Sequence, residues 1–151
     1  ICLLSCTVSF HFNTTEDSCT PRTGNNDNNK RAGLEIVVLS GSVSNPTMSK
    51  YLFDPCPART PGADSTGGGT IIDATTFQNG VSIPVTNGII ARVVPIYNSV
   101  KIGVTSSVNI PVQGRIIEST GQSGETVRKV QYFSSHPQLP LEIFPYSIIS
   151  Q

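Results

Sequence analysis

Isoleucine and valine together number 29 in this 151-residue chain, whereas leucine and alanine together number 12. Side chains branched at Cβ lose rotamer freedom in a helix but pack well on a pleated sheet, so this ratio favours strands. Thirteen glycines and eleven prolines leave few stretches for helices of ordinary length. The sequence therefore predicts an all-β fold, an antiparallel sheet or sandwich with long loops, in a single domain spanning residues 1–151.

The pattern of apolar residues locates the expected strands. Residues 7–13 alternate, with Val8, Phe10 and Phe12 facing inward, and the apolar run 34–40 indicates a central strand. Polar residues 20–31 and the proline- and glycine-rich residues 54–70 are expected to be long loops. Further strands are expected at Ser49–Phe53, Thr70–Ala74, Val81–Val85, Gly88–Tyr97 and Lys101–Thr105, with turns at Asn45-Pro46, Asn79-Gly80, Asn87-Gly88 and Asn98-Ser99.

The stretch 112–136 predicts a β-hairpin. Two runs rich in β-branched residues flank Ser119–Gly124, whose glycines suit a loop of four to six residues. Because side chains alternate along a strand, two sets share opposite faces of the second run: Thr126, Arg128, Val130 and Tyr132 on one, and Val127, Lys129, Gln131 and Phe133 on the other. Neither face is purely apolar, which is typical of a strand near the edge of a sheet.

The charge pattern disfavours two classes of partner. Charged residues make up 13% of the chain, about half the usual share, and they sum to zero. Proteins that bind nucleic acid or an anionic membrane surface normally carry a basic excess, so neither partner is expected. The 33 serines and threonines are typical of extracellular β proteins.

Four cysteines, an even number, fit an oxidising compartment, although four buried thiols are the alternative. A Cys19–Cys56 disulfide is expected because each residue lies in a loop-like segment beside a predicted strand. Cys2 and Cys6 would lie about 13 Å apart along an extended strand, too far to bridge, whereas a helical turn would bring them within reach.

The N-terminal segment carries two further signals. Residues 1–6 are apolar but much shorter than the roughly 20 residues that span a membrane, and a start at Ile1 suggests a processed or truncated chain. Asn13-Thr14-Thr15 is a glycosylation sequon, which makes Asn13 a possible glycosylation site in a suitably equipped host.

No catalytic arrangement is expected. Gly121-Gln122-Ser123-Gly124 resembles the sequence around a serine-protease nucleophile, and His11, Asp73 and Ser123 fall in a suitable order. That mechanism needs the histidine bonded to both partners, however, and His11 lies within a predicted strand while Ser123 is explained by the hairpin turn. We therefore expect no enzyme activity.

Metal and cofactor sites are not expected either. His11 and His136 have no partner at zinc-ligand spacing, and Asp73 and Glu118 are isolated carboxylates. The alternating oxygen ligands of Asn25, Asp27 and Asn29 lack the distal glutamate of a calcium loop. The sequence predicts no cofactor and no bound metal.

Several segments nevertheless match a known pattern: Lys50–Cys56, Ile83–Gly88, Ala91–Asn98, Ile102–Val104, Ile117–Gly124, Arg128–Gln131, Leu139-Pro140 and Phe144–Tyr146. Together they cover about the last two thirds of the chain and resemble the globular part of type IV pilin-like proteins, in particular minor pilins of the PilX type. Such pilins begin with a long apolar helix, which this sequence lacks. Residues 1–6 are either its remnant, or the helix lies upstream of Ile1.

The resemblance implies a structural subunit in or at the tip of a cell-surface filament, serving adhesion, DNA uptake or motility. The fold would then be β-rich α+β if the helix is present, and the partners would be the same or other pilin subunits and a host-cell or surface ligand. Membrane contact is expected only through the missing helix. The alternative is a carbohydrate- or protein-binding β-sandwich module of a secreted protein, which aromatic residues clustered on one sheet face would favour.

Overall fold

The computed structural model describes residues 2–15, 19, 31–42, 44–112 and 114–135, and these residues confirm the all-β fold. The chain divides into two compact units, residues 1–110 (the sheet unit) and 111–151 (the ribbon unit), each considered by itself. The single domain expected above stays a prediction. The described strands are β1 Cys2–Phe12, β2 Gly33–Ser42, β3 Asn45–Phe53, β4 Gly67–Ile72, β5 Thr75–Ile96, β6 Ile102–Ser106, β7 Gly114–Ser123 and β8 Thr126–Ser135, with a 3₁₀ turn at Pro57–Arg59.

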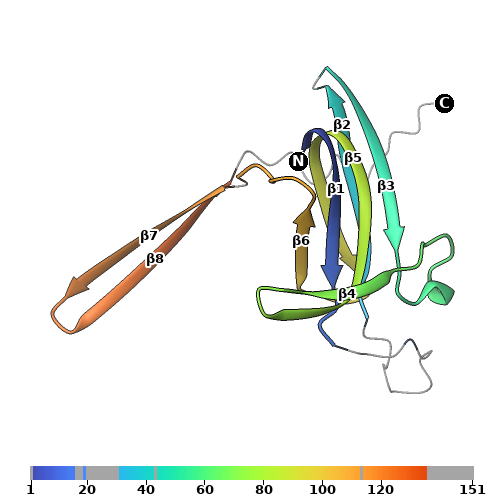
Figure 1. Cartoon of the computed structure of the whole chain (residues 1–151). Coiled ribbons are helices and arrows are strands. Elements are labelled where there is room, and N and C mark those ends of the chain that lie inside the picture. Colours follow the sequence, from blue (N-terminus) through green and yellow to red (C-terminus); the bar gives the residue numbers. More distant parts are fainter. Residues whose placement is uncertain (1, 16–18, 20–30, 43, 113, 136–151) are drawn as a thin grey trace. The chain divides into compact units, whose positions relative to one another are not determined.

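The sheet unit is one six-stranded antiparallel sheet in the order β3-β2-β5-β1-β6, with β4 also paired to β5 (Figure 1). The 22-residue strand β5 organises it. Its first third pairs with β4, its middle with β1 over residues 79–88, and its last third with β2 over residues 88–96. Strands β1, β2 and β4 thus pair with β5 directly, whereas β3 pairs with β2 and β6 pairs with β1.

The long strand bends where its partner changes. Asn87 has a positive φ of 49°. Next to it, Ser40 pairs with Gly88 but Leu39 pairs with Ile90, which leaves Ile89 as an extra residue. Such a bulge bends a strand and increases its twist.

The Asn-Gly turns expected at positions 79 and 87 are therefore wrong, because both dipeptides lie inside β5. An Asn-Gly pair indicates a backbone that tolerates positive φ, and a bulge within a strand uses that tolerance as readily as a turn does. The hairpin turn between β4 and β5 is instead formed by Asp73 and Ala74, with φ values of 46° and 60°. Positive φ at both central positions is the geometry of a type I′ turn.

One face of the sheet encloses the core. The alternation predicted for residues 7–13 is confirmed, since Val8, Phe10 and Phe12 are all buried, and the central strand predicted at 34–40 lies within β2. Burying such side chains stabilises the fold by about 1.5–3 kcal/mol each. The buried cluster comprises Cys6, Val8, Phe10, Phe12, Leu34, Ile36, Val38, Phe53, Val81, Ile83 and Val85.

Strand β3 is longer than the predicted Ser49–Phe53. It begins at Asn45, which pairs with Ser42, and so it includes the Asn45-Pro46 pair that was expected to form a turn. A proline lacks the N–H that a central strand needs, but β3 lies at the end of the strand order and has a neighbour only on the β2 side. An edge strand therefore tolerates Pro46.

The described part of the ribbon unit is a single β-hairpin, β7–β8, which we call the ribbon (Figure 1). Ten residue pairs join its strands, from Gly114–Ser135 to Ser123–Thr126. The hairpin and the two predicted faces are confirmed. The expected loop of four to six residues is wrong, because the turn consists of Gly124 and Glu125 alone, with Gly124 at a φ of 60°.

Candidate functional site

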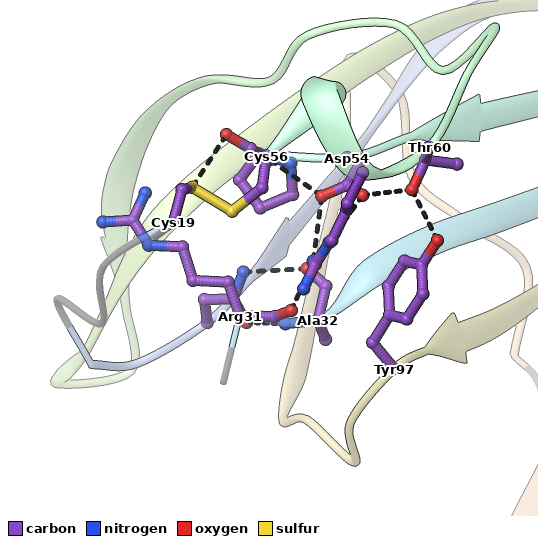
Figure 2. A network of polar contacts seen from close by, with 10 residues as sticks. Cys19, Arg31, Ala32, Asp54, Cys56, Thr60 and Tyr97 are labelled. Atoms are coloured by element: carbon purple, nitrogen blue, oxygen red, sulfur yellow. Dashed lines mark hydrogen bonds and ion pairs between the residues drawn. A yellow bond between two sulfur atoms is a disulfide. The ribbon is translucent and has the colours of Figure 1, made fainter. Parts of the chain in front are cut away.

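The described residues contain one dense polar cluster, at the end of β3 (Figure 2). The segment after β3 closes on itself: the backbone N–H of Asp54 donates to the carbonyl of Asp64, and the N–H of Asp64 donates to the carbonyl of Leu52, at N···O distances of 3.0 and 2.8 Å. These bonds hold the backbone of Asp54 in place immediately after Phe53, the core residue that ends β3. The side chain of Asp54 is fully buried.

The Asp54 carboxylate accepts four hydrogen bonds. Oδ1 accepts from the backbone N of Cys56 at 2.8 Å and from Nη2 of Arg59 at 2.9 Å. Oδ2 accepts from Nε of Arg59 at 2.8 Å and from the hydroxyl of Thr60. Burial alone would raise the pKa of Asp54, but the hydrogen bonds from Arg59, Thr60 and Cys56, together with the charge of Arg59, hold that pKa below its usual value.

Arg59 connects this loop to two other parts of the chain. Its Nη2 also donates to the carbonyl oxygen of Arg31, just before β2, at 2.6 Å. Its guanidinium carbon lies 4.1 Å from the ring centroid of Tyr97, just after β5, in a cation–π contact. Because the Thr60 hydroxyl donates to Asp54, the Tyr97 hydroxyl is the donor in the 2.6 Å bond between Tyr97 and Thr60.

The predicted Cys19–Cys56 disulfide is confirmed, with 5.4 Å between the Cα atoms. The sulfur of Cys19 also lies 3.3 Å from the carbonyl oxygen of Pro55, a close contact in which the bonded sulfur has no hydrogen to donate. Cys6 is disulfide-bonded as well, so the alternative of buried free thiols fails. The expectation about Cys2 concerns a side chain outside the described residues.

These contacts make the cluster a clamp. The disulfide, the Asp54–Arg59 pair and Tyr97 join the segments that follow β1, β3 and β5. A carboxylate whose oxygens accept four hydrogen bonds has no lone pair directed at a substrate or a metal ion. The arrangement holds these loops in place.

Asn13 has a comparable structural role. Its φ is 57°, its side chain is buried, and its Oδ1 accepts from the backbone N of Ala32 at 2.9 Å. Its Nδ2 donates both hydrogens, to the carbonyl of Ala32 at 3.1 Å and to Oδ1 of Asn79 at 2.9 Å. A glycan would replace one of those hydrogens, so glycosylation at Asn13 requires this buried contact to open.

The residues of the serine-protease pattern have other contacts in the described part of the chain. Nε2 of His11 bonds to the hydroxyl of Thr105 at 3.2 Å, and its Nδ1 is buried without a partner. Within the described part of the chain, no hydrogen bond joins His11 to Asp73, which lies in the β4–β5 turn. Ser123 is the last residue of β7, in the other unit. Burial lowers the pKa of His11, which therefore stays neutral more readily than a free histidine.

Among the remaining candidates, the structure describes Glu118. Glu118 is paired across the exposed ribbon with Lys129 at 2.8 Å and accepts from Gln131 at 2.6 Å. The described residues contain no group of three or more side chains suited to hold a metal ion. The residues Asn25, Asp27 and Asn29, at which no calcium loop was expected, lie outside the described residues, as does His136.

Sequence reasoning missed the roles of Arg59, Thr60 and Tyr97. The many prolines and glycines of residues 54–70 predict an irregular loop, and neither they nor any periodic pattern indicates which side chains of that loop contact one another. A local signal was available in the sequence. Asp54 directly follows the strand, and Cys56 and Arg59 come two and five residues later.

No family model, curated protein or solved structure matches this chain. Within the part of the chain that the structure describes, no helix has the length and apolar character needed to cross a bilayer.

Proposed function

We propose that this chain is a structural subunit of a cell-surface filament, similar to a type IV pilus minor pilin, that serves adhesion or assembly. The observation that carries the proposal is the exposed ribbon. A two-stranded hairpin alone is marginally stable in water, and large apolar side chains of this one are mostly exposed. In an assembly, neighbouring subunits would bury these apolar side chains and stabilise the hairpin.

Two further features support the same role. The clamp around Asp54 and the Cys19–Cys56 disulfide hold three connecting segments together, which suits a protein that functions outside the cell under mechanical and proteolytic stress. The disulfide itself fits an oxidising compartment. Self partners or other pilin subunits, and a host-cell or other surface as ligand, follow from the proposed role.

The alternative of a carbohydrate-binding module has no specific observation in its favour. That function favours aromatic side chains gathered on one face, but Tyr132 and Phe133 are consecutive residues of β8 and so lie on opposite faces of the ribbon. Tyr97 is engaged by Arg59 and Thr60.

The test is made in the organism that carries the gene. Antibodies raised against the folded chain should label fibres sheared from the cell surface, and deletion of the gene should reduce fibre number or surface attachment. A chain found only as a monomer in the medium, with fibres and attachment unchanged by deletion, would refute the proposal.

A further inference from the structure

His11 lies between two glycines on the face of the sheet opposite the core. Phe10 and Phe12 point into the core, and His11 alternates with them along β1, so it points to the other face. The residues paired directly with His11 are Gly80 on β5 and Gly103 on β6. Neither glycine has a side chain that could cover the imidazole or bond to it.

The β4–β5 hairpin occupies the space that these two glycines leave. A Cβ added to Gly80 would lie 3.1 Å from Nδ1 of His11 and 2.9 Å from the carbonyl oxygen of Gly68 in β4. A Cβ added to Gly103 would lie 2.9 Å from two ring atoms of Phe77. The hairpin therefore packs beside His11 at both glycine positions, and it depends on the absence of a side chain there.

The imidazole of His11 has one bonded nitrogen and one buried nitrogen. Nε2 bonds to the hydroxyl of Thr105 at 3.2 Å, whereas Nδ1 is buried and has no hydrogen-bond partner in the described part of the chain. The ring of Phe77, almost fully buried, lies 6.4 Å from the imidazole between centroids. A neutral imidazole fits this environment, because its single N–H can lie on Nε2, next to Thr105.

A protonated His11 does not fit the closed hairpin. An imidazolium carries an N–H on both nitrogens, so Nδ1 becomes a donor that is buried without an acceptor. Such a donor loses its bond to water and gains none in return. Burial lowers the pKa of His11 for the same reason. Movement of β4 and Phe77 away from the sheet would let water reach Nδ1 and remove the penalty.

Few charged residues lie on the strands around His11. Apart from His11 itself, strands β1, β4, β5 and β6 contain one charged residue, Arg92, in the part of β5 that pairs with β2. The adjoining turns carry Asp73, which is exposed, and Lys101, whose Nζ bonds to the hydroxyl of Thr75 at 3.2 Å. Of these groups, histidine is the one whose charge changes between about pH 5 and 8.

We propose that His11 is an acid-sensitive latch: neutral His11 leaves the β4–β5 hairpin (residues 67–78) closed over β1 and β6, and its protonation favours opening of that hairpin. Opening exposes Phe77 and Ile72. Neither residue belongs to the core cluster on the other face, so the core stays in place. The latch requires no filament and thus goes beyond the proposed function.

Amide hydrogen exchange in low concentrations of urea, at several pH values, tests the latch. Exchange through a local opening is insensitive to urea, whereas exchange through global unfolding accelerates with it. We expect the urea-insensitive protection factors of β4 amides to fall as the pH drops below 6.5, by at most about tenfold per pH unit, the limit for uptake of one proton. Those of β3 amides, which pair with β2, should stay constant over the same range.

Three variants locate the effect. His11→Gln removes the titrating group and should abolish the pH dependence in β4. Addition of Thr7→His to that variant places a histidine at an exposed position on the same face of β1, and the pH dependence should stay absent. Gly103→Ala is the reverse control, since its Cβ meets the ring of Phe77 and should increase opening equally at every pH.

The wild-type pH series alone can overturn the latch, even where His11→Gln fails to fold. A pH dependence confined to urea-sensitive exchange would mean that His11 affects only global stability. Protection of β4 that stays constant below pH 6.5 would mean that protonation does not act on the hairpin. Protection that rises would mean that the protonated Nδ1 finds an acceptor, such as the carbonyl oxygen of Gly68, and closes the hairpin further.

Discussion

The two units have similar strand sequences but bury their apolar side chains to very different extents. Both are built from strands rich in valine and isoleucine, yet Ile36 and Ile83 of the sheet unit are almost fully buried, whereas Ile116 and Ile117 of the ribbon are mostly exposed. The difference lies in the number of strands. Six strands of the sheet unit share one core, whereas the described part of the ribbon unit is a single pair of strands. Apolar content alone therefore does not determine burial.

The largest expected contrast is between two phenylalanines. Phe12→Ala should lower the free energy of unfolding of the sheet unit by about 3–5 kcal/mol, because Phe12 is fully buried in the core. Phe133→Ala in the ribbon should change that free energy by less than about 0.5 kcal/mol. Urea unfolding monitored by amide hydrogen exchange in β1 measures both. Similar losses for the two variants would show that the units share a core.

A second contrast concerns the two ion pairs. Asp54→Asn should destabilise the sheet unit by about 3 kcal/mol, since it leaves Arg59 without its carboxylate partner in a mostly buried site. Glu118→Gln breaks the exposed pair with Lys129 and should cost less than about 1 kcal/mol. Denaturant midpoints of the two variants provide the measurement. An Asp54→Asn variant as stable as the wild type would mean that the clamp is dispensable.

The turns allow a third, smaller contrast. Ala74 in the β4–β5 turn and Gly124 in the β7–β8 turn both have a φ of 60°. Ala74→Gly should stabilise the sheet unit by about 0.5–1 kcal/mol, because glycine adopts that conformation without strain. Gly124→Ala should weaken the ribbon by a similar amount, although the added Cβ has open space around it. Thermal unfolding checks the first variant and hydrogen exchange in β8 the second. A destabilised Ala74→Gly variant would contradict the strain argument.

The smallest expected effect depends on pH. The folded chain lowers the pKa of His11 below the 6.5 of a free histidine, so below pH 6.5 the unfolded chain binds more protons and the sheet unit loses stability as the pH falls. His11 lies near Gly80, Phe77 and Thr105, and none of these three residues is charged. The lowered pKa of Asp54 adds a second loss of the same sign below pH 3.8.

His11→Gln separates these two effects. It should abolish the loss of stability just below pH 6.5 and keep the loss below pH 3.8. Urea midpoints measured across this range provide the test, and a wild-type stability that rises as the pH falls below 6.5 would have the wrong sign.

Local patterns in the sequence predicted elements well but not their partners. The alternation at Val8, Phe10 and Phe12 placed β1, the apolar run placed β2, and the opposite faces of β8 followed from its spacing. The continuity of β5 was not predictable, because Asn79-Gly80 and Asn87-Gly88 carry the same signal whether the chain turns or bulges. What decides between them is hydrogen bonding to β1, β2 and β4, which no short window contains.

The candidate site shows the same limit. The Cys19–Cys56 pair could be predicted because both residues lie in loops beside strands. The bond from Tyr97 to Thr60 and the position of Asn13 against Asn79 depend on residues brought together from far apart in the chain. The alternation of residues in the hairpin predicted its two faces but could not indicate that apolar side chains on both are exposed.

The pairing of β1 has a consequence for how the chain folds as it is made. All of the described backbone pairing of β1 is with β5 and β6, so that Val8 pairs with Ile83, and Phe10 with both Val81 and Val104. Strand β1 ends at Phe12 and β5 begins at Thr75, so β1 is synthesised well before either of its partners exists. Contacts so distant in sequence make folding slow. During that interval an apolar strand with two open edges is exposed to aggregation, and a chain of this topology should depend on a chaperone at its site of synthesis or export more than a simple meander would.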